Sequence, residues 1–330
     1  MSFSLDVHIK RRADYRRIER ALSEGSGVRA IARHLEVSTG TVLNRLERAA
    51  RSAFATLSEL STYLAHRESL AFDGFRSFCV CQHLPCDITH LIGRDSEYVY
   101  VFDYAPLRRG GRMNAAQRAS QKRFERSMSP NPHATEDSAA RIYDHILEAG
   151  RWPPEHPPKE IWSDEHYAYI RAWQAHSHIT HAQHLRWVIH RTISAKAPRT
   201  GQNPIRAVNY FDRELRKDLA EHHRETVCFA RTPHGMLARF AVYVAHHNMD
   251  KPKRISGSRS PWASERTATS HAVAAGAPAE VAARLQLTRL TSRPFLSRAY
   301  LGAFASLWWR GQIPTPPDRR MPHIQAYALA

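Results

Sequence analysis

Two aspartates stand where strand patterns carry a carboxylate into apolar surroundings. Asp73 lies inside the stretch SLAFDGFRSF, where burying a carboxylate is costly unless it has a partner. Asp164 follows a second short strand pattern at 160–163, just where a helical pattern begins. Carboxylate oxygens are the ligands that hard cations prefer, and two such cations about 3.5–4 Å apart can promote phosphoryl transfer. The two aspartates therefore predict a site for two Mg²⁺ or Mn²⁺ ions, which needs a third acid nearby.

The segments around these aspartates predict an α/β fold. Strand patterns at 69–81, 87–92 and 97–104 follow one another through short turns, which indicates an antiparallel β-meander. Two further strand patterns, at 160–163 and 185–189, alternate with helical patterns that begin near residues 167, 204 and 233. Alternation of this kind around one mixed sheet, with parallel strands flanked by helices, predicts a domain over residues 66–252. That domain carries a basic insertion around 105–150.

A small all-helical module is expected before this domain, over residues 1–65. A helix is expected at 11–23, and apolar residues between 28 and 46 line the facing sides of two short helices, the second capped by Ser38. A connecting helix is expected at about 48–65. The pattern is that of a helix-turn-helix, whose second helix enters the major groove, although an ordinary helical hairpin would show the same spacing. The side chains expected to contact DNA are Ser38, Thr39, Thr41, Asn44, Arg45 and Arg48.

Charge points to a polyanionic partner. The 330 residues include 48 Lys+Arg and 31 Asp+Glu, a formal net charge of +17. Residues 105–126 hold seven Lys+Arg and one acid, and Arg108, Arg109 and Arg112 are expected to bind DNA phosphates there. A solvated basic helix is the alternative for this block. Residues 253–330 are expected to form a basic, loosely structured tail with one helix near 278–288.

The chain also shows features of a cytoplasmic protein that does not cross a membrane. No uncharged apolar run approaches the roughly 18 residues that a membrane-spanning helix needs. The N-terminal residues lack the apolar core and cleavage site of a signal peptide. We therefore expect a cytoplasmic protein whose partner is double-stranded DNA.

Five segments, taken in order, resemble bacterial insertion-sequence transposases of the DDE type over about residues 26–252. They are Phe72-Asp-Gly-Phe-Arg76, Trp162-Ser-Asp-Glu-His-Tyr-Ala-Tyr169, Asn209-Tyr-Phe-Asp-Arg-Glu-Leu-Arg216, Arg224-Glu-Thr-Val-Cys-Phe-Ala-Arg231 and Ala241-Val-Tyr-Val-Ala-His-His-Asn248. The resemblance implies a ribonuclease-H-like domain with one aspartate on the first strand, one at the end of the fourth strand and one acid on a following helix. It implies metal-dependent cleavage and joining of DNA at insertion-element ends. It also implies binding of terminal repeats and target DNA, homo-oligomers assembled on DNA, and a place at the bacterial nucleoid.

The third acid is left with two main candidates. The family's Asn-x-x-acid pattern selects Asp212, although the family normally has Glu there, whereas Glu225 has the usual residue type but lies further along the chain. Asp103, on the third expected strand, is a further substitute. The expected catalytic and metal-binding residues are therefore Asp73, Asp164, Asp212 and Glu225. A DNA-binding regulator with a decayed catalytic domain is the alternative function, because aspartate replaces glutamate at the third position.

Overall fold

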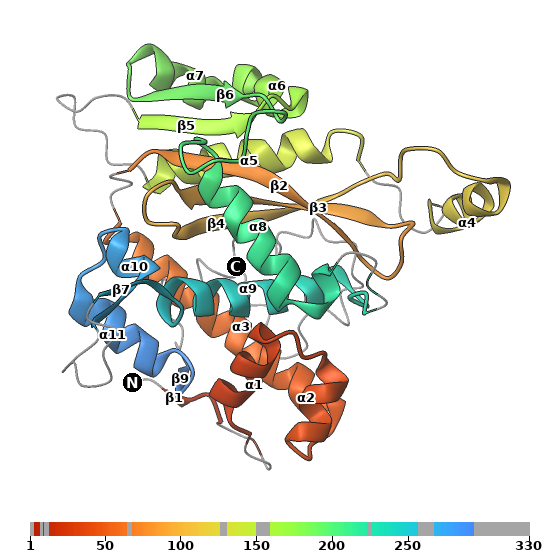
Figure 1. The fold of residues 1–330 in the computed structure, drawn as a ribbon, viewed down its shortest axis with the longest axis vertical. Helices are drawn as coiled ribbons and strands as arrows, with labels where there is room; N and C mark the ends of the chain where they lie inside the picture. Colours follow the sequence, from red (N-terminus) through yellow and green to blue (C-terminus); the bar gives the residue numbers. More distant parts are fainter. Residues whose placement is uncertain are drawn as a thin grey trace.

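The structure, a computed structural model, is a mixed α/β protein in which helices flank one five-stranded sheet (Figure 1). It describes residues 3–6, 9, 13–64, 68–125, 131–149, 159–223, 226, 228–256 and 267–293. The expected alternation of strands and helices around a mixed sheet is therefore observed.

The sheet combines an antiparallel and a parallel half. Its strands are β2 (Leu70–Phe78), β3 (Pro85–Gly93), β4 (Val99–Pro106), β5 (Lys159–Asp164) and β6 (Val188–Ile193). They lie in the order β4-β3-β2-β5-β6. The antiparallel pairs β2–β3 and β3–β4 form the expected meander, whereas β2–β5 and β5–β6 are parallel. The first strand of the meander, β2, is therefore central and joins the two halves.

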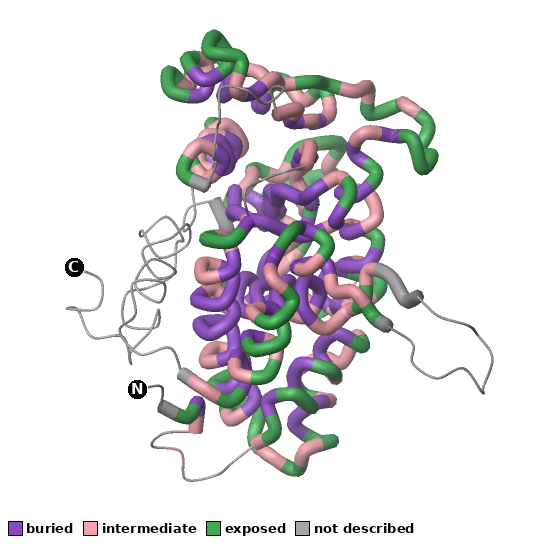
Figure 2. The backbone as a smooth tube through the Cα atoms, turned by 90° about the vertical axis from the view of Figure 1, so that its left-hand side faces the viewer, coloured by how far each residue is buried: buried purple, intermediate pink, exposed green. Residues whose placement is uncertain are grey.

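Helices cover both faces of the sheet. On one face α5 (Ala134–Ala149) packs against β3 and β4, with α6 (Tyr167–Ala175) and α7 (Ser177–His184) beside it. On the other face α8 (Arg206–Asp218) packs against β2 and β3, and a short 3-10 helix, η1 (Ala220–His222), follows it. Next to α8 lies α9 (Pro233–Met249), whose Phe240 contacts both Phe102 and Phe211. Figure 2 shows the buried residues gathered along the middle of the molecule, where these layers meet.

Three helices form the N-terminal part: α1 (Tyr15–Ser23), α2 (Val28–His34) and α3 (Thr39–Ser61). Ser38 caps α3 as expected, since its hydroxyl accepts a hydrogen bond from the Thr41 N–H at 3.0 Å. In the turn before it, Glu36 has a φ of +52°, a left-handed conformation that favours glycine. The expected second helix and connecting helix are one uninterrupted helix, which packs along α9. Buried alanines in its middle give a smooth face for that packing.

The described part of the C-terminal segment differs from the loose tail that was expected. It contains β7 (Pro252–Ser256), β8 (Thr267–Ser270), α10 (His271–Ala274), α11 (Ala279–Thr288) and β9 (Ser292–Arg293). The helix expected near 278–288 is α11. β9 pairs antiparallel with β1 (Phe3–Ser4), so the two ends of the described chain lie together. Arg289 and Arg284 of this segment bind Glu19 of α1 and Glu59 of α3, although its composition is poor in large apolar residues.

The basic insertion contains α4 (Ala115–Glu125), which Figure 1 shows projecting away from the sheet. Among the described helices, none combines the length and apolar character needed to cross a membrane.

Candidate active site

Asp73 and Asp164 lie on neighbouring strands, as the sequence predicts. The parallel ladder between β2 and β5 pairs Leu70 with Ile161 and Ala71 with Trp162. Continuing the same register places Asp73 opposite Asp164, the last residue of β5. Residues at the same level of adjacent parallel strands face the same side of a sheet. The fold therefore brings these two carboxylates to the same level and the same face of the sheet.

The carboxylate of Asp73 is held by its own strand and by α6. Its Oδ1 accepts hydrogen bonds from the Gly74 N–H at 2.7 Å and from the Tyr169 hydroxyl at 3.3 Å. A Cβ on Gly74 would lie 2.9 Å from that hydroxyl, so only glycine leaves room for it. Burial raises the pKa of Asp73 to about 7, and repulsion from the Asp164 and Asp212 carboxylates contributes to the rise. The structure therefore places both Asp164 and Asp212 within electrostatic reach of Asp73.

Asp212 comes to this face from α8. Its Oδ1 lies 3.2 Å from Nε2 of His90, a fully buried side chain of β3 that stands directly opposite Asp73 in the β2–β3 ladder. Interaction with Asp212 raises the pKa of His90, against the lowering effect of burial. No pattern in the sequence singles out His90, and it is the strand register that places this residue beside the acids.

The donor set fits a hard divalent cation. All three groups offer carboxylate oxygens, the ligand type that Mg²⁺ and Mn²⁺ take. The buried Oδ1 atom of Asp212 lies 3.2 Å from Nε2 of His90 but accepts no hydrogen bond of good geometry there, which leaves a lone pair for a metal. Burial, and then repulsion from Asp164 and Asp212, raises the pKa of Asp73, and a bound cation would offset this rise. Among the described residues, Asp73, Asp164 and Asp212 therefore form a group whose chemistry fits Mg²⁺ or Mn²⁺.

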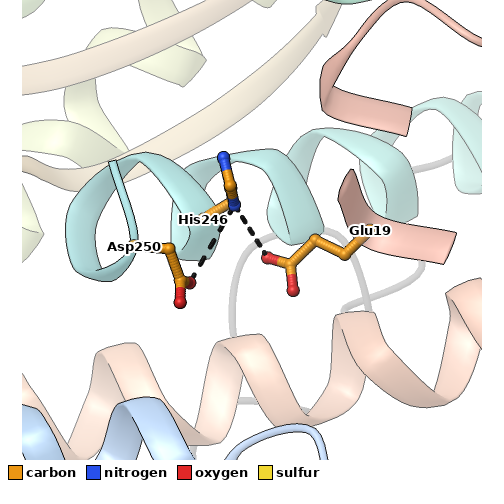
Figure 3. A group of neighbouring side chains, drawn as sticks. All are labelled: Glu19, His246 and Asp250. Carbon is orange, nitrogen blue, oxygen red and sulfur yellow. Dashed lines mark ion pairs between the residues drawn. The ribbon is translucent and has the colours of Figure 1, made fainter. Parts of the chain in front are cut away.

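A tighter group of possible ligands lies elsewhere, between α1 and α9. Glu19, His246 and Asp250 have ligand atoms within 4.8 Å of one another, and ion pairs join His246 to both acids (Figure 3). Arg289 already binds both carboxylates, donating to Glu19 at 2.7 and 2.9 Å and contacting Asp250. A buried guanidinium supplies the positive charge there, so this group forms an ion-pair network. Among the described residues, the three aspartates do not form a group whose ligand atoms all lie within 4.8 Å of one another.

Of the two other candidate acids, the structure describes only Asp103. Glu225 lies outside the described residues. Asp103 is buried and accepts a hydrogen bond from Arg141 of α5 at 2.9 Å, on the opposite face from α8. Its substitute role is therefore not supported, since α5 already neutralises its charge.

Two of the residues expected to contact DNA are not exposed. Arg45 is 4% exposed, with its guanidinium 5.9 Å from the centre of the Tyr15 ring, and it donates to the Asn44 side chain at 2.9 Å. Arg48 is half-buried and donates to the Leu5 carbonyl at 2.7 Å. The expectation that both arginines are exposed is wrong, because α1 and the N-terminal segment cover that side of α3.

The other expected DNA contacts lie at the surface, apart from Arg109. Ser38, Thr39 and Asn44 are exposed and Thr41 is partly exposed, next to a 48% exposed Leu43. In the basic insertion, Arg108 and Arg112 are exposed. Arg109 is partly buried, with Nη1 2.7 Å from Nδ1 of His83.

Comparisons with models of known protein families, with curated proteins and with solved structures find no match to this chain.

Proposed function

We propose that the chain is a DNA transposase that cleaves and joins DNA at insertion-element ends by metal-dependent phosphoryl transfer. The observation that carries the proposal is the convergence of Asp73, Asp164 and Asp212 on one face of the sheet. Asp73 lies on the first strand of the sheet in chain order, Asp164 ends the fourth, and Asp212 lies on a following helix. This is the arrangement that the ribonuclease-H-like resemblance implies.

The three aspartates would hold two Mg²⁺ or Mn²⁺ ions. When bound, such ions activate the attacking oxygen and stabilise the leaving oxygen of a phosphodiester. The protein's own contribution is to fix the carboxylates: the Gly74 N–H and the Tyr169 hydroxyl hold one oxygen of Asp73. Water would first attack the phosphodiester at the element end. The released 3′-hydroxyl would then attack target DNA, without a covalent protein intermediate.

The N-terminal helices would bind the terminal repeats as a helix-turn-helix. Its reading surface is the exposed start of α3, with Thr39 and Asn44 as candidates for base contacts. Arg45 and Arg48 would support this surface from inside rather than touch DNA. The protein would act in the bacterial cytoplasm at the nucleoid, as a homo-oligomer assembled on two element ends.

We expect Asp73→Asn and Asp164→Asn each to lower Mg²⁺-dependent cleavage of a supercoiled plasmid carrying the element ends by about 10³-fold or more. The reason is that a metal ligand supplies several kcal/mol of charge stabilisation in the transition state, and each 1.36 kcal/mol is tenfold in rate. The matched control is Glu165→Gln, which removes an exposed carboxylate beside Asp164 and should leave the rate unchanged.

Full activity in both asparagine variants would contradict the proposal. Binding of element ends with no metal-dependent cleavage by the native chain would instead favour the alternative, a DNA-binding regulator. The aspartate at the third acid position, where the resembling family has glutamate, is the observation behind that alternative.

The basic insertion should contribute to DNA affinity through phosphate contacts. Arg118, Lys122 and Arg123 of the projecting helix α4 are exposed. Replacing all three with Ala should reduce the slope of log Kobs against log salt by about 2–3, because each phosphate contact contributes about 0.9. The slope is measured by fluorescence anisotropy with a labelled duplex.

The control for this prediction removes the same charge from arginines that already pair with acids. These are Arg191 with Glu160, Arg206 with Glu97 and Arg284 with Glu59. An equal change of slope in both triple variants would show that net charge, and not the position of α4, sets the affinity.

A further inference from the structure

His90 occupies an unusual place for a histidine. Its side chain is fully buried in the middle of β3, among apolar residues of the sheet. Both ring nitrogens face oxygen atoms: Nδ1 lies 3.0 Å from the Ile88 carbonyl, and Nε2 lies 3.2 Å from Oδ1 of Asp212. The imidazole thus connects the backbone of β3 to a side chain of α8.

Asp212 needs such a connection more than the other two acids do. Strand register fixes where Asp73 and Asp164 stand, and backbone N–H groups hold each of them, from Gly74 at 2.7 Å and from His166 at 2.9 Å. Asp212 instead projects from a helix, and the close polar contact of its buried Oδ1 is Nε2 of His90, itself buried and otherwise without a hydrogen bond. Repulsion from the neighbouring carboxylates favours rotation of its side chain away from them.

Ring packing and strand pairing both fix the place of the His90 side chain that contacts Asp212. The Phe211 ring of α8 packs edge-on against the His90 ring, with centroids 5.3 Å apart at 66°. Asp73 is the cross-strand partner of His90, so the residue that meets Asp212 stands directly opposite the first acid. The position of His90 therefore depends on the same strand pairing that fixes Asp73.

We propose that His90 is the positioning residue for Asp212: it holds the third carboxylate of the site toward Asp73 and Asp164, in the orientation in which it binds a divalent cation. This inference rests on the proposed function, because it takes Asp212 as a metal ligand. Groups that hold metal ligands in place typically affect metal affinity by 10–100-fold.

The test compares two amides of different reach at position 90. The amide nitrogen of glutamine stands near the place of Nε2, whereas that of asparagine corresponds to Nδ1 and stops short of Asp212. Mn²⁺ binding to the full-length, DNA-free protein is measured from the electron paramagnetic resonance signal of free Mn²⁺. We expect His90→Gln to bind within about threefold of the native affinity and His90→Asn about tenfold more weakly or worse. Circular dichroism checks that both variants are folded.

A second measurement separates positioning from general damage. In the Asp212→Asn background, His90→Asn should have no additional effect on Mn²⁺ affinity, because the side chain that it positions is no longer a ligand. As a control for loss of a buried imidazole, His271→Asn, on α10, should leave Mn²⁺ affinity unchanged.

Equal Mn²⁺ affinities of the asparagine and glutamine variants at position 90 would overturn the inference. If Asp73→Asn and Asp212→Asn still abolish Mn²⁺ binding in that case, the metal site of the proposed function stands without its positioning residue. A native chain that binds no Mn²⁺, or whose binding survives Asp73→Asn, would overturn the inference together with the metal site.

Discussion

We expect Asp212→Asn to abolish strand cleavage. Mg²⁺-dependent nicking of plasmid DNA should fall by about 10³-fold or more. An amide keeps the size of the carboxylate but loses its charge and one good metal ligand. Binding of a labelled duplex should survive, because the start of α3 and the basic residues of α4 lie outside the cluster.

The matched variant is Glu225→Gln, which tests the other candidate for the third acid. We expect measurable cleavage in this variant, its loss limited to whatever ion pair the side chain makes with arginines nearby in the sequence, typically worth about 0–1 kcal/mol. An inactive Glu225→Gln beside an active Asp212→Asn would reverse the assignment. Glu225 would then be the third ligand, and the contact between His90 and Asp212 would be structural.

Arg289→Met should destabilise the protein by about 3–5 kcal/mol at neutral pH, because it leaves buried carboxylates without their cation. The side chain of Arg289 is 2% exposed and binds Glu19 and Asp250. Urea unfolding followed by circular dichroism measures the change. Arg284→Met, on helix α11 just before Arg289, is the control: its pair with Glu59 is exposed and should cost about 0–1 kcal/mol.

The loss of stability in Arg289→Met should depend on pH, in a direction that follows from the pKa of Glu19. Burial raises the pKa of Glu19 to about 7, while Arg289 opposes the rise. A raised carboxyl pKa makes the folded state bind a proton that the unfolded state releases, so the contribution to stability is lost as pH rises toward 7. Without Arg289 the pKa rises further, and the loss extends to higher pH. The difference between native and variant chains should therefore be larger at pH 8 than at pH 5.5, and a difference that shrinks as pH rises would contradict it.

Local patterns in the sequence carried much of the fold. All five strands of the sheet lie where alternation and turn residues place them, within a few residues. Asp73 follows Leu70 at the same interval as Asp164 follows Ile161, the strand partner of Leu70, so the same strand pattern brings both aspartates to one level of the sheet. Helix starts at Ser38 and Pro233 were also visible, since a capping hydroxyl and a proline in the first turn are local signals.

The place of His90, which contacts the third acid, depends on a tertiary contact that the sequence does not show. A strand pattern that runs to Cys81 predicts the wrong turn, because the chain leaves β2 at Phe78 and Val80 adopts a φ of +66°. Its N–H donates to the Ala230 carbonyl at 2.7 Å, so a residue far along the chain sets this turn. This turn sets the register of the β2–β3 pair, and that register places His90 opposite Asp73. Sequence alone shows neither step.

The burial of Arg45 could not be predicted from the sequence either. Helical periodicity assigns it to a polar face, which is correct for an isolated helix. Tyr15 of α1 covers that face in the folded chain. A long side chain with an aliphatic stem can lie against such a surface, and periodicity alone cannot show which neighbour will cover it.

The uninterrupted helix α3 also fixes a length. Its 23 residues span about 35 Å at 1.5 Å per residue, close to one turn of B-form DNA. One end carries the surface proposed to read the terminal repeat, and the rest is clamped against α9 beneath the sheet. The helix would then act as a rigid ruler between the sequence that is read and the bond that is cut. A single residue inserted into it would swing the reading surface by about 100°, whereas seven would return it to nearly the same heading but farther out.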